Sequence, residues 1–114
     1  MARVIITKDL EEKINKKFKK ESVEIFELMR SLKDNPRKGK PLAQIGGILI
    51  KELKYKSFRF YFIVDGYRIK LLDAGELVDL LIKFIAMSDK KDQQQVIEQI
   101  KDFLRNFGKE ALKE

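Results

Sequence analysis

The segment from Ile48 to Leu72 constrains the fold most, because its apolar side chains recur at every second position. A period of two places successive side chains on opposite faces of a β-strand. Asp65-Gly66 is a strong signal for a two-residue hairpin turn, and Lys56-Ser57 is a weaker candidate for the turn before it. The segment therefore predicts a meander of antiparallel strands.

The two turns fix an expected register. Counting outward from Asp65-Gly66 gives three pairs: Val64 with Tyr67, Phe62 with Ile69, and Phe60 with Leu71. The Lys56-Ser57 turn gives two more: Lys54 with Arg59, and Glu52 with Tyr61. One face of the meander is then apolar and is expected to be core: Leu53, Phe58, Phe60, Phe62 and Ile69. The opposite, exposed face brings together Lys54, Arg59, Tyr61 and Lys70.

That exposed face has two interpretations. Cations with an aromatic side chain indicate a surface for a polyanion, most of all RNA. Alternatively, Glu52 neutralises its cationic neighbours and the face is ordinary solvated surface. The net charge of +7 and the pI near 9.6 agree with the polyanion, but solvated lysine-rich helices produce the same balance.

The remaining segments predict a strand, helices and a further strand. Residues 3–7 are β-branched and predict a short strand. Two short helices follow, opened by Asp9 and by Ser22, and the second ends near Asp34. Their apolar stripes are Leu10, Ile14 and Phe18, then Ile25, Phe26, Met29 and Leu32. Single stripes of this kind predict a helical hairpin that lies on a flat layer.

The segment 35–47 is rich in Pro, Gly and Lys and predicts a loop without a nucleotide-binding glycine pattern. Residues 76–87 are apolar at nearly every position and predict a strand buried on both faces. A last helix is expected from Ser88-Asp89 to Gly108, with a stripe of Val96, Ile97, Ile100, Phe103, Leu104 and Phe107. The fold class is therefore α+β: a small, mainly antiparallel sheet, an N-terminal helical hairpin on one face and a C-terminal helix.

Composition narrows the class of protein. A chain of 114 residues fits a single domain, residues 1–114. It holds no Cys and no His, which excludes disulfides and removes the usual metal ligands and the commonest general base. We expect no metal, no cofactor and no membrane contact, because no apolar run reaches the length of a bilayer span. Without a secretory signal pattern, the expected location is cytoplasmic.

The order of elements, with three short motifs, resembles the RelE/ParE superfamily of toxin–antitoxin toxins, and its HigB-like branch most. The motifs are Glu52-Leu53-Lys54, Phe58-Arg59-Phe60-Tyr61 and Lys90-Lys91. The resemblance implies a toxin that cleaves mRNA, generally on the ribosome and without metal, and that a cognate antitoxin protein neutralises. The candidate catalytic residues are Lys54, Arg59, Tyr61, Lys90 and Lys91. The candidate RNA-binding residues are Lys51, Lys56, Arg68 and Lys70.

The chain departs from the RelE pattern at three places. When Arg59 is aligned, the two strand lysines of RelE-type members fall on Ile50 and Glu52. The late catalytic tyrosine of that branch has no counterpart, because Val96 and Ile97 occupy its neighbourhood. Two other functions therefore stay open: a non-catalytic RNA- or ribosome-binding domain, and a ParE-like toxin that acts through contact with DNA gyrase.

Overall fold

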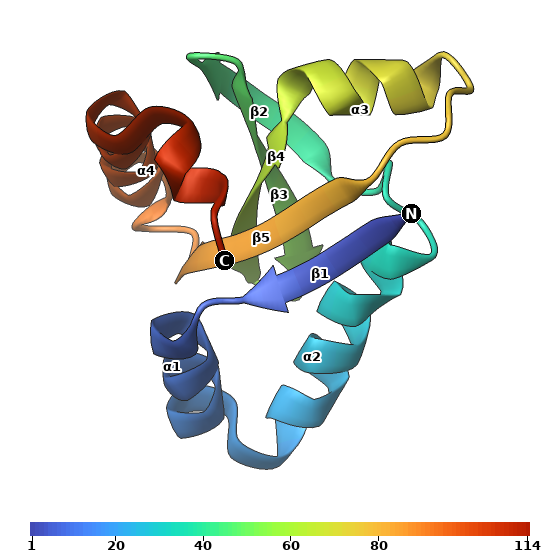
Figure 1. Cartoon of the computed structure of the whole chain (residues 1–114). Helices are drawn as coiled ribbons and strands as arrows, with labels where there is room; N and C mark the ends of the chain where they lie inside the picture. The colour runs from blue at the N-terminus through green and yellow to red at the C-terminus, as the bar shows by residue number, and fades with distance from the viewer.

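A computed structural model describes residues 1–114 and contains one five-stranded sheet (Figure 1). The strands are β1 (Ala2–Ile6), β2 (Lys40–Ile45), β3 (Ile48–Tyr55), β4 (Phe58–Asp65) and β5 (Leu80–Ser88). Their order across the sheet is β1-β5-β4-β3-β2. Only β1 and β5 pair in parallel, and the other three pairs are antiparallel. The mainly antiparallel sheet predicted from the sequence is confirmed.

Helices cover both faces of this sheet. The helices are α1 (Lys8–Phe18), α2 (Ser22–Arg30), α3 (Gly66–Asp73) and α4 (Gln93–Phe107), with short 3-10 turns at Lys19–Glu21, Ser31–Lys33 and Gly108–Leu112. Figure 1 shows α1 and α2 together on one side of the sheet and α4 on the other. The expected N-terminal helical hairpin and C-terminal helix are therefore present. No helix of the structure combines the length and the apolar character needed to cross a membrane.

The first core lies between the sheet and the two N-terminal helices. The helices contribute the buried side chains of Leu10, Ile14, Ile25, Met29 and Leu32, and the strands contribute Leu53, Phe60, Phe62, Val64, Leu80, Ile82 and Phe84. The Phe62 and Phe84 rings have centroids 4.9 Å apart, a separation at which aromatic pairs attract. The predicted stripes of the two N-terminal helices are confirmed, and so is the apolar face of the meander except for Ile69, which reaches this core from α3.

The second core lies under α4 and corrects the sequence interpretation of the opposite sheet face. Ile48, Ile50, Tyr61 and Ile63 pack there against Ile100, Leu104 and Ala111. Tyr61 is 0% exposed, so the expectation of an exposed Tyr61 is wrong. The cause is the apolar stripe of α4, which must be buried and covers this face of the central strands.

The hairpin predicted at Asp65-Gly66 is also wrong, because these residues start α3. The Asp65 carboxylate accepts hydrogen bonds from the backbone N–H groups of Tyr67 and Arg68, at 2.9 and 3.2 Å, and so caps the helix. The Gly66 N–H donates to the Gly47 carbonyl at 2.8 Å, which fastens this end of β4 to the turn between β2 and β3. A Cβ atom at Gly66 would lie 2.9 Å from that carbonyl oxygen, so a side chain does not fit.

The pairs expected from that hairpin do not form. Val64 does not face Tyr67, Phe62 does not face Ile69, and Phe60 does not face Leu71, because all three partners lie in α3. On that side β4 pairs with β5 instead, with Phe62 opposite Phe84 and Phe60 opposite Met87. Lys70 moves to α3 with the rest of the segment, so its predicted place on the sheet beside Lys54 is wrong.

The β3–β4 register is the one predicted. Lys54 lies opposite Arg59 and Glu52 opposite Tyr61, across a turn at Lys56-Ser57 in which Lys56 has a φ of 53°. The turn is fastened to the α1–α2 connection, because Glu21 accepts a hydrogen bond from the Tyr55 hydroxyl and pairs with the Lys56 ammonium, each at 2.5 Å.

Residues 40–45 form the edge strand β2 where the sequence predicted only loop. Gly46 and Gly47 both have positive φ, 54° and 85°, and make the two-residue turn that joins β2 to β3. The pairing of β2 with β3 is irregular between Pro41 and Ala43. Pro has no N–H to donate, so it is tolerated in an edge strand and at an irregularity but not in a central strand.

Helix starts differ from expectation by a few residues. Thr7, and not Asp9, caps α1, since its hydroxyl accepts from the Leu10 N–H at 3.4 Å. Ser22 lies inside α2 and donates its hydroxyl to the Lys19 carbonyl. The last helix was expected to start at Ser88-Asp89 but begins at Gln93. The Asp89 carboxylate accepts hydrogen bonds from the backbone N–H groups of Lys91 and Asp92, so residues 89–92 form a turn before the helix.

Candidate functional site

Three polar side chains meet at the end of the sheet where β3 turns into β4. Lys54 on β3, Arg59 on β4 and Ser88 on β5 occupy neighbouring register positions. Residues directly opposite one another in antiparallel strands have Cβ atoms roughly 4.5–5.5 Å apart. Lys54 is exposed, whereas Arg59 is only 8% exposed. The structure therefore brings together the two candidate residues that the sequence placed opposite each other.

Glu52 joins this group and is the carboxylate of the site. Its Oε2 lies 3.7 Å from the Nε of Arg59, and both side chains are about nine-tenths buried, at 11% and 9% exposed. Arg59 also donates from a terminal nitrogen to the Phe58 carbonyl at 3.2 Å. The guanidinium is thus held in one place at the sheet surface. Glu52 was absent from the predicted site residues, although the β3–β4 register places it diagonally across from Arg59.

A hollow of about 540 Å³ opens beside this pair. Its lining consists of Lys38, Gly39, Lys40, Glu52, Leu53, Lys54 and Arg59. Four of these residues are cationic and one is a carboxylate. None of the three lysines makes an ion pair, so their charges are free for a ligand. We name this space the cationic hollow, and its charge suits a phosphate-bearing ligand.

Lys40 is the first residue of β2, and Lys38 lies two residues before it; both line the cationic hollow. Lys40 pairs in register with Glu52, so the edge strand brings its cation to the carboxylate. The sequence interpretation missed both lysines because it treated residues 35–47 as loop. The signal that could have found them is Gly46-Gly47, a two-residue hairpin signal equal in kind to Asp65-Gly66.

Tyr61 lies behind the hollow and does not open onto it. Its hydroxyl and the Ser88 hydroxyl are hydrogen-bonded at 2.7 Å inside the sheet–α4 interface. Burial raises the pKa of the Tyr61 phenol, the Ser88 hydrogen bond lowers it, and the charge of Glu52 raises it further. The phenol therefore stays protonated at neutral pH. Its hydrogen bond to Ser88 joins β4 to β5 next to Arg59. Tyr61 was predicted as a catalytic residue, but its ring is fully buried and cannot touch a ligand in the hollow.

Lys51 is buried on the other face of β3. Only 4% of it is exposed, its ammonium donates to the Arg37 carbonyl at 3.1 Å, and it lies 5.7 Å from the centre of the Phe62 ring. Burial lowers the pKa of Lys51. Arg37 in turn pairs with Asp73 at 3.1 Å. Lys51 is therefore not a surface cation. Its hydrogen bond to Arg37 holds the segment that carries Lys38 against β3.

The other predicted RNA-binding residues lie apart from the hollow. Lys56 pairs with Glu21, and Arg68 donates to the Asp79 carbonyl at 2.9 Å. Arg68 and Lys70 stand on α3, which follows the opposite end of β4. The structure does not gather these three residues with Arg59.

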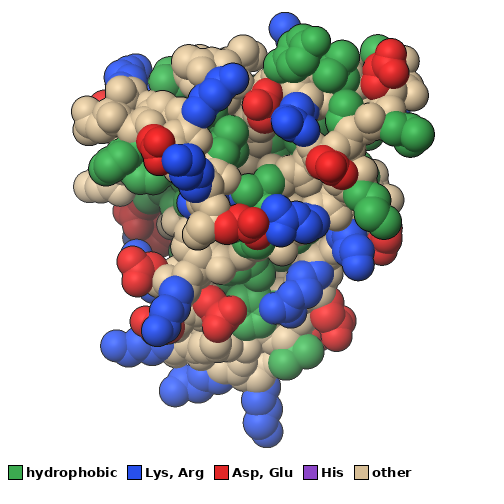
Figure 2. Space-filling view, in the orientation of Figure 1, with side chains coloured by type: hydrophobic (Ala, Val, Ile, Leu, Met, Phe, Trp, Pro, Cys, Tyr) green, Lys and Arg blue, Asp and Glu red, His purple; other side chains and the backbone are tan.

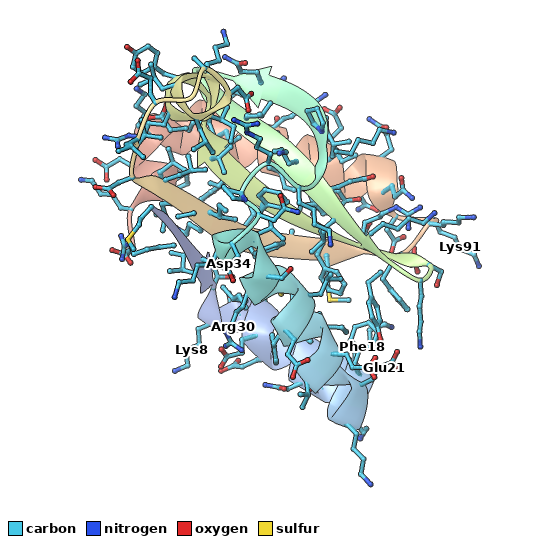
Figure 3. The ribbon with its side chains drawn as sticks, turned by 90° about the vertical axis from the view of Figure 1, so that its right-hand side faces the viewer. Lys8, Phe18, Glu21, Arg30, Asp34 and Lys91 are labelled. Atoms are coloured by element: carbon cyan, nitrogen blue, oxygen red, sulfur yellow. The ribbon has the colours of Figure 1, made fainter.

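Lys90 and Lys91 lie in the exposed turn that follows Ser88. Figure 3 shows Lys91 on the same side of the molecule as Phe18 and Glu21, and Glu21 pairs with Lys56 of the β3–β4 turn. Neither lysine makes an ion pair. Both are therefore placed to extend the positive charge around Arg59.

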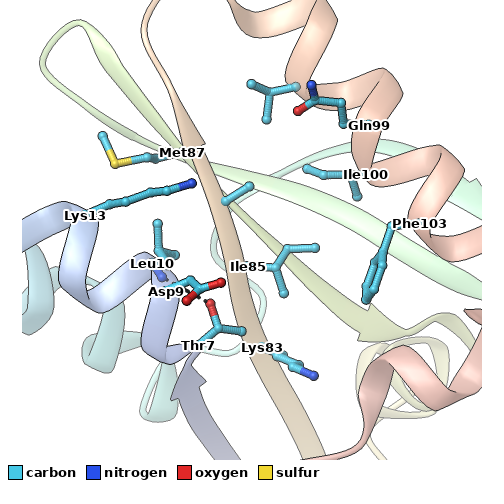
Figure 4. A pocket seen from close by; sticks show the side chains of 12 residues that line it. Thr7, Asp9, Leu10, Lys13, Lys83, Ile85, Met87, Gln99, Ile100 and Phe103 are labelled. Atoms are coloured by element: carbon cyan, nitrogen blue, oxygen red, sulfur yellow. Dashed lines mark hydrogen bonds between the residues drawn. The ribbon is translucent and has the colours of Figure 1, made fainter.

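A second cavity, of about 390 Å³, lies between α1 and α4 along β5 (Figure 4). Its walls are mainly apolar, with Leu10, Ile85, Ile100 and Phe103 among them. The β1–β5 pairing ends at Phe84, which leaves the last part of β5 without a strand on this side. Lys13 is the one exposed cation there, and Asp9 lies nearby, so this cavity does not match the charge of the cationic hollow.

The surface seen in Figure 2 has a different character from the β3–β4 end. Acidic and basic side chains are interspersed over it, and apolar side chains gather over the α3 side. The exposed apolar residues of that region are Tyr67, Leu77 and Met1. No protein-family model, curated protein or solved structure matches this chain.

Proposed function

We propose that this protein is a toxin of the toxin–antitoxin kind, an endoribonuclease that cleaves mRNA on the ribosome by a mechanism that needs no metal. The observation that carries the proposal is the cationic hollow, in which Lys54 and Arg59 stand side by side next to the Glu52 carboxylate. A phosphodiester with a 2′-hydroxyl is the ligand whose chemistry requires both kinds of group together.

The reaction is an internal transfer. The 2′-oxygen attacks the adjacent phosphorus, the O2′–P bond forms and the P–O5′ bond breaks, which leaves a 2′,3′-cyclic phosphate and a 5′-hydroxyl. A base must take the 2′ proton, an acid must protonate O5′, and cations must stabilise the added negative charge.

Each requirement has a candidate group in the hollow. Glu52 is the base, because it is the carboxylate of the hollow and lies against Arg59. Arg59 holds the phosphate through its planar fork, which matches two phosphate oxygens at once. Lys54 is the acid for the leaving O5′, since its free ammonium stands directly across from Arg59. Tyr61 is a positioning residue, because its hydrogen bond to Ser88 holds β5 beside Arg59 and Tyr61 itself does not touch the phosphate.

The proposed partners follow from the same surface. Lys90 and Lys91 hold neighbouring phosphates of the mRNA or the ribosomal RNA, because they are exposed and unpaired. The cognate antitoxin is a small protein whose acidic segment covers the cationic hollow and excludes RNA from it.

A non-catalytic RNA- or ribosome-binding domain is the second candidate, and one observation favours it. Arg59 is largely buried and already faces Glu52, so the cations of the hollow could bind a phosphate without any proton transfer.

Incubation of the protein with mRNA on translating ribosomes, followed by mapping of the cleaved ends, separates the two candidates. The proposed ribonuclease gives 5′-hydroxyl and 2′,3′-cyclic phosphate ends. It gives none on an mRNA whose 2′-hydroxyl at the cleaved position is replaced by hydrogen. Tight ribosome binding without new ends supports the binding domain instead, and absence of both binding and cleavage contradicts both candidates.

A further inference from the structure

A second hollow, of about 350 Å³, lies at the same end of the sheet as the cationic hollow, on the α1 side, and we name it the α1 hollow. Lys13, Lys16 and Lys17 of α1 line it together with Phe58 and the Asp89–Asp92 turn. Phe58 immediately precedes Arg59, and Ser88, which also lines this hollow, is the register neighbour of Arg59 on β5. The hollow is therefore next to the cationic hollow but belongs to another set of side chains.

Free cations and an aromatic ring meet in this second hollow. Lys13, Lys16 and Lys17 are exposed and make no ion pair. The Lys17 ammonium lies 5.2 Å from the centre of the Phe58 ring. An ammonium at that distance from a ring centre gains cation–π energy.

Phe58 is held in position by its neighbour from α1. The Phe18 ring meets it edge to face, with centroids 4.9 Å apart and an interplanar angle of 86°. Phe58 is partly exposed, unlike Phe60 and Phe62 on the same strand. A fixed, partly exposed ring beside ammonium groups is the arrangement on which proteins stack a base of single-stranded nucleic acid.

Two carboxylates also face this hollow and limit its charge. Asp89 is engaged by its own turn, because its carboxylate accepts from the N–H groups of Lys91 and Asp92 at 2.8 and 3.0 Å. Asp92 stands at the start of α4. Three ammonium groups against two carboxylates leave a modest positive surplus, which suits one phosphate rather than a run of them.

Phe58 and Arg59 are consecutive in β4, so their side chains point to opposite faces of the sheet end. An RNA strand held by Arg59 therefore reaches Phe58 by passing over the edge of the sheet end. Lys90 and Lys91 follow Ser88 beside that path. One flexible RNA strand can therefore occupy the two hollows in succession. An RNA duplex is too stiff to bend around the edge of the sheet in this way.

We propose that the α1 hollow is a second nucleotide subsite for single-stranded RNA, in which a base stacks on Phe58 and Lys16 and Lys17 hold its phosphate. The subsite rests on the proposed function, since it assumes that RNA occupies the cationic hollow. It assigns a role to Lys16 and Lys17 at the end of α1 and none to Lys19 and Lys20 in the 3-10 turn that follows.

The test compares two double variants of equal charge, Lys16→Ala/Lys17→Ala and Lys19→Ala/Lys20→Ala. All four lysines are exposed and close together, but Lys19 and Lys20 line neither hollow. The probe is a single-stranded oligonucleotide with 2′-O-methyl sugars, which binds but cannot be cleaved. We expect the first variant to lose about fivefold or more in affinity and to flatten the log–log salt slope by about 0.7, one phosphate's worth. The second variant should stay near wild type.

A second measurement follows the base itself. An oligonucleotide that carries 2-aminopurine at successive positions should show strong quenching at one position with wild type, because stacking quenches this base. Phe58→Leu keeps an apolar side chain and should remove that quenching, while binding through Arg59 continues.

The outcomes separate failure of the subsite from failure of the proposed function. Equal loss in both lysine variants means that only long-range charge acts, and it overturns the subsite. Unchanged quenching in Phe58→Leu also overturns it. If Arg59→Ala weakens binding and Lys16→Ala/Lys17→Ala does not, the subsite falls and the cationic hollow stands. If wild type does not bind the oligonucleotide, the subsite falls, and cleavage of mRNA on ribosomes decides the proposed function separately.

Discussion

Arg59 and Glu52 face each other across neighbouring strands, with Nε and Oε2 3.7 Å apart and both side chains about nine-tenths buried, at 9% and 11% exposed. A buried charge is costly without a partner, so Glu52 stabilises Arg59 in the free protein. The same pairing places a proton acceptor against a phosphate-binding fork. Stability and the proposed chemistry therefore depend on one contact, and they can be separated by substitutions that change one partner at a time.

Arg59→Lys keeps the charge and removes the planar fork. We expect the variant to fold and to bind ribosomes nearly as well as wild type. Cleavage should fall by roughly 10²–10³, the usual cost of losing one donor that stabilises transition-state charge. Single-turnover cleavage of mRNA on ribosomes measures the effect. Lys70→Ala is the control, because Lys70 lies on α3 outside the hollow and should change nothing. Equal cleavage by Arg59→Lys and wild type would place the chemistry elsewhere.

Glu52→Gln should move binding and cleavage in opposite directions. Removal of the one carboxylate in the cationic hollow raises its positive charge, so RNA affinity should increase. Loss of the proton acceptor should lower cleavage by roughly 10²–10⁴. The free energy of unfolding should drop by about 1–3 kcal/mol, because Arg59 loses its charged partner. A variant that loses stability but cleaves normally would reduce Glu52 to a structural role.

The sequence predicted the parts of the fold that depend on local periodicity. The Lys56-Ser57 turn fixed the β3–β4 register, and the stripe through Leu10 and Ile14 fixed the buried face of α1. It failed at Asp65-Gly66, because Asp followed by Gly suits both a hairpin turn and a helix start. The choice was decided by partners distant in sequence, since β5 takes the place beside β4 and Gly47 accepts from Gly66.

The candidate site divides in the same way. The adjacency of Lys54 and Arg59 follows from one short turn, so the sequence could predict it. The contributions of Lys38 and Lys40 depend on β2, whose pairing the sequence did not reveal. The burial of Tyr61 depends on α4, which packs on that sheet face from more than thirty residues along the chain. Contacts set by distant segments have no signature in the periodicity of the segment itself.

Phe60→Ala tests the first core. Phe60 is fully buried, and its ring centre lies 6.2 Å from that of Phe18. Truncation leaves a cavity that the rigid sheet cannot close, so we expect a loss of roughly 3–5 kcal/mol in the free energy of unfolding. Phe107→Ala is the matched control, because Phe107 is 56% exposed and should change stability by about 0.5 kcal/mol or less. Urea unfolding measures both, and similar losses in the two variants would contradict the packing.

RNA affinity should depend steeply on salt. Four cations line the cationic hollow, and a single strand that contacts four phosphates gives a log–log slope of about −3. Lys40→Ala should reduce the slope by about 0.7, since it removes one of these contacts. Binding of a non-cleavable single-stranded oligonucleotide at several salt concentrations provides the measurement. A slope near zero would exclude phosphate contacts as the source of affinity and would favour a protein partner for this surface.

Lys51 gives the chain a pH dependence of stability with a defined sign. Its ammonium is buried against Phe62 and donates to the Arg37 carbonyl, and burial lowers its pKa in the folded protein. The unfolded chain therefore binds this proton more tightly than the folded protein does. Between the lowered pKa and the ordinary lysine value of about 10.5, unfolding takes up a proton, so the Lys51 contribution to stability increases as the pH rises.

Lys51→Met removes this titration and keeps an unbranched side chain of similar length. We expect the stability difference between wild type and Lys51→Met to shift in favour of wild type as the pH rises through that window, and to stay constant below it. Urea unfolding at several pH values from 7 upward measures the difference. The stability of Lys70→Met, a substitution at an exposed position on α3, should change with pH in parallel with that of wild type.

The hydrogen bond from Lys51 to Arg37 also orders the segment that carries Lys38. Lys51→Met should therefore weaken oligonucleotide binding several-fold, although Lys51 itself is buried and cannot touch the ligand. Unchanged binding together with a parallel pH profile would show that the buried ammonium orders nothing around the hollow.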